Sequence, residues 1–317
     1  MPQIRAYTPG IYARSEELVQ ATRDLDRGRT SEEAVAAQQD ADLWVFLDAQ
    51  KEANLDYFSD GLLNWQDIFR PFDTTAEGLR PGPLTRFLNT NTFYRAPAVE
   101  MERPRLVEPL GEPFFRIGDL PRGRWVATLP SPHALAEWAT GEVEPQVVAE
   151  GILGPQIRWL AGNGCAYVVL QETALFSPRS DLYGLSEALE ALASPLPLAL
   201  QLPFGDAGNL LEELIELPID AIGVDFYATS VAGLSRPFPK TLLAGIIDAR
   251  NSLLEEPREL VEFGWSLLED MEGPELHLVP NGDLQFVPEK IAREKVLRLG
   301  AAARILKDAV TEEGAAT

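Results

Sequence analysis

Histidine and cysteine are the scarcest chemically active residues in this sequence. Among 317 residues there are two histidines, His133 and His277, and one cysteine, Cys165. A single cysteine cannot form an internal disulfide, so the sequence gives no sign of an oxidising compartment. Zinc sites draw three or four ligands, mostly from cysteine and histidine. A zinc site here would have to join residues far apart in the chain or rely on carboxylates.

Basic residues are also in short supply. Lysine and arginine total 27 against 49 aspartates and glutamates, which gives a net charge of −22 at pH 7. Nucleic acids and anionic membrane surfaces both attract clustered Lys and Arg, which this composition does not favour. No apolar run approaches the ~20 residues of a membrane-spanning helix, and the first residues lack the apolar segment of a signal peptide. We therefore expect a cytoplasmic protein that binds neither nucleic acid nor membranes.

Short apolar runs alternate with helical patterns along most of the chain. The runs that indicate strands begin at Ile4, Leu55, Trp125, Tyr167, Leu198, Ala221, Leu242 and Leu276. Such alternation is typical of parallel strands joined by right-handed crossovers. Eight strands in a chain of this length predict an α/β fold, a single (β/α)8 TIM barrel. An open doubly wound sheet is the alternative, but no glycine-rich GxGxxG loop supports it.

The barrel is expected to occupy residues 1–310 as one domain. Residues 70–122 are rich in proline and in short aromatic runs, which indicates an excursion between the second and third strands. The tail at 311–317 is small and polar, so we expect it to fray.

Polar residues at the predicted strand ends are the candidates for a site, because TIM barrels build their sites on the loops that follow the strands. Besides the residues given below as catalytic, these ends carry Asp67, Ser131, Phe204 and Asp283. We expect substrate contacts from Asp60, Asn64, His133, Gln171, Glu172, Asp206, Tyr227 and Asn281. The alternative for each Asp or Asn is an ordinary role in closing a turn or capping a helix.

Asp225, Asp248 and Arg250 are predicted to be the catalytic residues. Asp225 follows the apolar run 221–224, so its carboxylate would be partly desolvated and would need a cation or hydrogen-bond donors to stay ionised. Arg250 is the nearest candidate cation in strand order. An ion pair that only supports the barrel is the alternative. His277, inside the last strand, is expected to be a hydrogen-bonded core histidine, and Cys165 a small buried residue.

Several of these segments resemble the cobalamin-independent methionine synthase family, in particular its catalytic C-terminal barrel. They include VLQETAL at 169–175, AGIIDAR at 244–250 and VPNGDL at 279–284, together with 53–61, 125–132 and 220–226. Their order and spacing carry the resemblance. It implies the barrel shared by the methionine synthase and uroporphyrinogen decarboxylase superfamily.

The resemblance also implies a zinc site, because the family activates homocysteine as a thiolate on zinc held by His, two Cys and Glu. It places the His-x-Cys pair on the stretch 200–206, which begins Leu200-Gln201-Leu202, and the last cysteine on Gly282. The glutamate ligand corresponds to Asp225, and the aspartate that binds the amino group of homocysteine corresponds to Gln171. One aspartate without sulfur or imidazole ligands does not hold zinc at useful affinity. We therefore expect a degenerate zinc site and no zinc cofactor.

Three functions remain open. The first is a methyltransferase, similar to the 5-methyltetrahydrofolate/homocysteine methyltransferases of methionine biosynthesis, that acts on a small molecule at a zinc-free site. The second is a non-catalytic barrel that binds a metabolite or supports a partner, either another protein or a second copy of the chain. Cofactor-free decarboxylation ranks third, because it calls for several arginines at the site and only Arg250, with Arg14, Arg86 or Arg95, offers itself.

Overall fold

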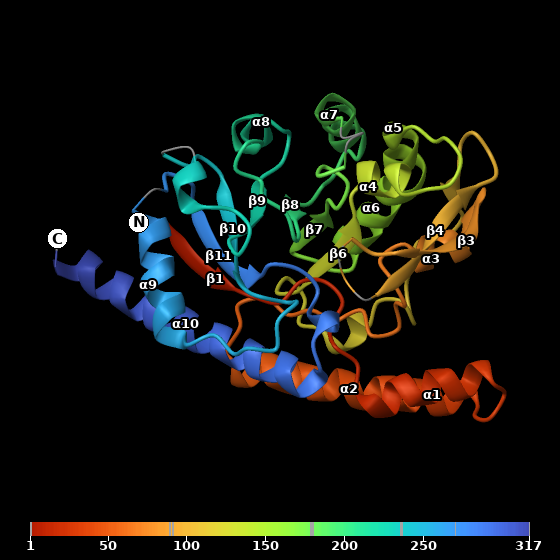
Figure 1. Cartoon of the computed structure of the whole chain (residues 1–317), viewed down its shortest axis with the longest axis horizontal. Coiled ribbons are helices and arrows are strands. Elements are labelled where there is room, and N and C mark those ends of the chain that lie inside the picture. The colour runs from red at the N-terminus through yellow and green to blue at the C-terminus, as the bar shows by residue number, and fades with distance from the viewer. Residues whose placement is uncertain are drawn as a thin grey trace.

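Seven parallel strands curl around a common axis in the computed structural model, which describes residues 2–88, 90, 92–177, 181–234, 237–269 and 271–316 (Figure 1). In sheet order they are β1 (Gln3–Ala6), β11 (Glu275–Pro280), β10 (Thr241–Ile247), β9 (Ala221–Asp225), β8 (Leu198–Leu202), β7 (Tyr167–Gln171) and β6 (Val126–Pro130). Most of their residues are buried and apolar, as parallel strands covered on both faces require. The fold is the α/β barrel that the strand count predicts.

The predicted second strand, near Leu55, is shorter than expected. It forms a single parallel bridge, between Phe58 and Trp125, and the Asp56 amide donates to the Ala6 carbonyl at 2.9 Å. The segment therefore closes the barrel between β6 and β1 without forming a regular strand. The Asp56 carboxylate accepts from the Ala6 amide and from Lys307, so part of the join is made by a side chain instead of a backbone ladder.

Helices cover the outside of the barrel. α1 (Glu16–Asp26) and α2 (Glu32–Glu52) begin at Ser15 and Ser31, whose hydroxyls accept from backbone amides in the first turn. In Figure 1 these two helices run along the same side as the long α10, while α7 and α8 lie on the opposite side. The remaining helices are α4 (Pro132–Glu137), α5 (Pro145–Val148), α6 (Gly154–Gly162), α7 (Leu182–Ala191), α8 (Leu211–Ile215), α9 (Pro257–Leu268) and α10 (Glu289–Ala316), with a π-helical turn at Ala149–Leu153 and 3-10 turns at Ile117–Asp119, Val231–Gly233 and Leu284–Phe286. α10 continues past Val310 to Ala316. No helix in the described ranges is long and apolar enough to cross a membrane.

The predicted excursion folds back over the barrel. It contains α3 (Arg70–Thr75), the antiparallel hairpin of β3 (Leu79–Arg86) and β4 (Phe93–Val99), and a short ladder of β2 (Ala76–Glu77) and β5 (Arg105–Leu106). Phe87, at the end of β3, stacks on Phe286 with ring centroids 6.0 Å apart, and Phe204 meets Phe286 edge-on at 5.4 Å. The hairpin therefore covers part of the barrel end where β8 and β11 finish.

The inside of the barrel is a small cluster of its own. It is formed by Tyr7, Val126, Tyr167, Val169, Ala199, Ala221, Leu243 and Val279, whereas the alternate residues of the strands pack against the helices. His277 lies in this interior, 3.2 Å from the Tyr7 hydroxyl and 2.9 Å from Glu275, so it is a hydrogen-bonded core histidine. Cys165 is buried, and burial raises the pKa of its thiol to about 12, which does not suit a nucleophile.

Candidate active site at the barrel mouth

A cavity of about 400 Å³ opens at the barrel end formed by the carboxyl ends of the strands. Loops after β6, β7, β8 and β10 contribute to it, and the β3–β4 hairpin forms a further wall. Its lining residues are Arg86, Leu88, Thr90, Trp138, Thr173, Phe176, Ser177, Pro203, Phe204 and Arg250. Three aromatic rings and two arginines thus surround a space at the end of the barrel where sites of this fold are built.

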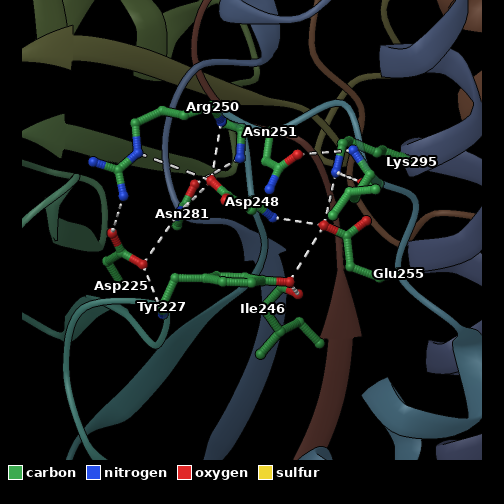
Figure 2. A network of polar contacts seen from close by, with 11 residues as sticks. Asp225, Tyr227, Ile246, Asp248, Arg250, Asn251, Glu255, Asn281 and Lys295 are labelled. Atoms are coloured by element: carbon green, nitrogen blue, oxygen red, sulfur yellow. Dashed lines mark hydrogen bonds and ion pairs between the residues drawn. The ribbon is translucent and has the colours of Figure 1, made fainter. Parts of the chain in front are cut away.

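Arg250 is the predicted catalytic residue that lines this cavity. Its guanidinium lies 4.6 Å from the centre of the Phe204 ring, a cation–π contact. Nη2 is 3.8 Å from Asp225 Oδ2, and Nε is 3.9 Å from Asp248 Oδ1 (Figure 2). The side chain is 36% exposed, so the charge is held by two carboxylates on one side and remains reachable on the other.

Asp225 lies behind Arg250 and does not line the cavity. Its Oδ1 accepts from the Tyr227 amide at 2.9 Å and from Asn281 Nδ2 at 3.0 Å. Its Oδ2 has no hydrogen-bond partner among the described residues, and the side chain is fully buried. Burial raises the pKa of this carboxyl, although the Asn281 and Tyr227 hydrogen bonds and the Arg250 charge oppose the shift. Asp225 therefore orients the guanidinium from inside the barrel.

Asn281 joins the ends of β9, β10 and β11. Its Oδ1 accepts from the Ala249 amide at 2.8 Å, and its Nδ2 also approaches Asp248 Oδ1 at 3.4 Å. Gly245 allows this contact, because a Cβ there would lie 2.8 Å from Asn281 Cα. Asn281 thus holds both predicted catalytic carboxylates.

Gln171 belongs to a second buried cluster. Its Nε2 donates to Asp283, whose Oδ1 also accepts from the Ile11 amide at 3.2 Å. Gly10, with a φ of +83°, makes room for this carboxylate, because a Cβ would lie 2.1 Å from Asp283 Oδ1. Burial raises the pKa of Asp283. The sequence places Asp283 at a strand end, but Asp283 was not one of the residues expected to contact substrate.

His133 and Glu172 meet in a third cluster under the loop after β6. Glu172 accepts from Ser131 Oγ and, at 2.7 Å, from the Ala174 amide. His133 Nδ1 lies 3.2 Å from Glu172 Oε2. Burial alone would lower the pKa of His133, but the hydrogen bond and charge of Glu172 raise it overall. Neither residue lines the mouth cavity. Their neighbour Thr173 does line it, and the Thr173 hydroxyl accepts from Trp138 Nε1 at 2.9 Å.

Four other expected contacts lie away from this cavity. Asp60 and Asn64 line a separate cavity of about 310 Å³ between α2 and the segment around Arg116. Asp206 is exposed and closes a turn by accepting from the Gly208 amide. Tyr227 is 50% exposed, and its hydroxyl donates toward the Ile246 carbonyl and Glu255. Spacing along the chain placed all four at strand ends but could not tell which way each loop turns.

The positions that the resemblance assigns to zinc do not supply a zinc donor set. Leu200 and Leu202 pack in the outer layer with the helices, and Gln201 faces the interior, where its Nε2 donates to the Pro280 carbonyl at 2.9 Å. A Cβ at Gly282 would come 2.5 Å from Phe204 Cζ, so an aromatic ring fills the space next to it. In the described ranges no three His, Cys, Asp or Glu side chains are grouped so that they could hold a metal ion.

Sequence and structure comparisons connect the chain to known proteins. The family model "Cobalamin-independent synthase, N-terminal domain" matches residues 155–269. The match is therefore to the family's N-terminal domain, whereas the sequence resemblance given above is to its C-terminal barrel. The chain is 21% identical over 327 aligned positions to a methionine synthase of Sulfurisphaera tokodaii, covering 99% of this chain and 96% of that protein. It is 30% identical to a 5-methyltetrahydropteroyltriglutamate–homocysteine methyltransferase of Mycobacterium leprae, over 75% of this chain and 36% of that protein. A B12-independent methionine synthase from Shewanella shares the fold, with a TM-score of 0.70 and 15% identity over 90% of this chain and 92% of the other.

Proposed function

Because the chain belongs to the cobalamin-independent methionine synthase family, we propose that its barrel mouth binds a carboxylate-bearing small molecule and supports methyl transfer without zinc. The observation that carries this proposal is the position of Arg250. It is the cation held by Asp225 and Phe204 at the wall of the 400 Å³ cavity, with about a third of its side chain exposed.

A planar guanidinium matches a carboxylate, which it can bind through two parallel hydrogen bonds. The substrates in the name of the Mycobacterium leprae relative, a pteroyltriglutamate and homocysteine, both carry carboxylates. Trp138, Phe176 and Phe204 give the same cavity the flat apolar walls that a ring system needs. In a chain with a net charge of −22, a cavity with two arginines is a favourable place for an anion.

Methyl transfer to a thiol requires the thiolate, because the thiol itself is a poor nucleophile. Zinc is one way to form it, and a neighbouring arginine, which lowers the thiol pKa, is another. Two features argue against the first way in this chain: the apolar Leu200 and Leu202 at two positions that the resemblance assigns to zinc ligands, and the Phe204 ring beside Gly282 at a third. Arg250 would then stabilise negative charge on the bound molecule, and Asp225 would keep the guanidinium in place.

The experiment measures methionine formed from 5-methyltetrahydropteroyltriglutamate and homocysteine by protein stripped of metal with a chelator. We expect product without added zinc and its loss in Arg250→Ala. Arg258→Ala is the matched control, because Arg258 is 90% exposed on α9 and pairs with Glu262, one helical turn away. Turnover that appears only with stoichiometric zinc would overturn the zinc-free site.

A non-catalytic metabolite-binding barrel is the second candidate. It is favoured by the way the polar groups of the mouth satisfy one another: Asn281 with Asp225, and Gln171 with Asp283. The same experiment separates the two candidates. Calorimetric binding of the folate that depends on Arg250, without any methionine formed, would favour the second.

A further inference from the structure

The segment after β10, residues 248–256, brings Arg250 to the mouth although it contains no helix or strand. Side chains hold it in place. Asn281 accepts from the Ala249 amide at 2.8 Å, and Asp248 Oδ1 accepts from the Arg250 amide at 3.0 Å. The Asp248 amide in turn donates to Glu255 Oε1 at 2.9 Å, so the loop is closed on itself next to Arg250.

Glu255 is tied to α10 by a buried lysine. Lys295 has no exposed surface, and its Nζ donates to Glu255 Oε1 and to the Leu253 carbonyl, both at 2.7 Å (Figure 2). Three residues further along α10, Arg298 Nη1 donates to the Glu255 carbonyl at 2.7 Å. A lysine without exposed surface is costly unless its charge is paired and its hydrogen bonds are made. Lys295 meets both conditions within the loop that carries Arg250.

The same carboxylate oxygen also reaches the end of β9. Tyr227 Oη lies 3.3 Å from Glu255 Oε1, and the Tyr227 amide donates to Asp225. Glu255 Oε1 therefore receives Lys295, the Asp248 amide and the Tyr227 hydroxyl. Asp225 and Arg250, the pair at the mouth, stand at the two ends of this network. Neither Glu255 nor Lys295 is among the residues that line the cavity.

We propose that the buried Glu255–Lys295 pair is the positioning element of the anion site: it fixes the 248–256 loop so that the Arg250 guanidinium stays between Asp225 and Phe204. This inference rests on the proposed function only in taking Arg250 as the group that binds the ligand. A hydrogen-bonded loop of this kind keeps its cation in one place, and a small displacement of a binding group is enough to lose much of its interaction.

The test replaces both charges together, because removing one would leave the other buried and unpaired. In Glu255→Gln with Lys295→Met, the side chains keep their approximate volumes and the fold is expected to survive. We expect the affinity for 5-methyltetrahydropteroyltriglutamate, measured by calorimetry, to fall about 10- to 100-fold. Glu262→Gln with Arg258→Met removes an exposed pair from α9 and serves as the matched control, with unchanged affinity.

A purely structural role is separated by adding Arg250→Ala. If the pair acts through Arg250, the triple variant binds the folate as weakly as Arg250→Ala alone. Losses that simply add would refute positioning. A second readout needs no ligand: amide exchange at 248–250, followed by NMR, should accelerate in the double variant while exchange in β9 and β11 stays slow. Unchanged exchange at these amides would also overturn the inference. If the unmodified chain does not bind the folate, the proposed function fails and the exchange rates alone decide the positioning role.

Discussion

Asp73 is a buried carboxylate whose replacement should stabilise the protein in a pH-dependent way. It lies on α3 under the β3–β4 hairpin, 1% exposed, and both carboxylate oxygens lack a hydrogen-bond partner among the described residues. Burial raises its pKa from 3.8 to about 7, against the opposing charges of Arg70 and Arg95 and with the added repulsion of Asp67. The folded protein therefore holds a proton here that the unfolded chain has already released.

The sign follows from the direction of the shift. Between about pH 4 and pH 7 the native state binds the extra proton, so the free energy of unfolding falls as the pH rises through this window. The shift of about three units corresponds to at most ~4 kcal/mol of lost stability above pH 7. Asp73→Asn removes the titration. Its advantage over the unmodified chain should grow by up to ~3 kcal/mol between pH 5 and pH 8.

The assay is urea denaturation at several pH values, with the unfolding free energy of each variant compared at the same pH. Asp48→Asn is the control, because Asp48 is a surface carboxylate, 71% exposed, that pairs with Lys51 on α2. Its difference from the unmodified chain should stay small at every pH. If the Asp73→Asn difference is the same at pH 5 and pH 8, the carboxylate does not titrate in this range and the argument from burial is wrong.

Three further predictions concern the mouth and the polar clusters next to it. Arg250→Ala should cost about 1–2 kcal/mol of stability, less than the ~3–5 kcal/mol of a fully buried pair, because the Arg250 side chain is 36% exposed. Adding Asp225→Asn should recover part of this loss. Additive losses in urea denaturation would mean that the two side chains do not interact. The stabilisation that His133 contributes through Glu172 should be fully present below its unfolded pKa of ~6.5 and be lost as the pH rises through its raised folded pKa. His133→Gln should therefore flatten that part of the plot of unfolding free energy against pH. An unchanged plot would contradict the pairing with Glu172. Gly282→Ala should destabilise by about 1–3 kcal/mol because its methyl meets Phe204, and Phe204→Leu should relieve the loss; a stable Gly282→Ala would show that the ring gives way.

The expectation of a zinc-free site rests on residue types, because zinc chemistry depends on which side chains can serve as ligands. The near absence of cysteine and histidine is visible in the sequence, and this composition alone argues against a zinc thiolate. The sequence did not show what surrounds the positions that the resemblance assigns to zinc ligands. The position of the Phe204 ring beside Gly282 depends on a loop in which Phe204 has a φ of +62°. No local sequence pattern predicts this backbone conformation.

Other expected contacts were separated by the loops. Asp225, Asp248, Arg250 and Asn281 meet because they end neighbouring strands of a parallel sheet, and the order of those strands follows from the sequence pattern. Asp60 and Asn64 also follow a segment that the pattern predicts as a strand, but their loop turns toward α2 and lines another cavity. Side-chain direction in a loop is set by the packing of distant elements, which spacing does not encode.

The sequence by itself determined the barrel, because alternating apolar runs and helical patterns reflect which residues must leave water. It also determined which residues end the strands, and so the pool from which a site could be drawn. Only the tertiary structure decided that Arg250 lines the cavity while Asp225 stands behind it, and that Lys295 is buried against Glu255. Those two residues are 40 positions apart in the chain, and they meet only because α10 packs back across the barrel. Burial and charge pairing at such a distance are properties of the folded chain, since each depends on what every other segment places around the residue.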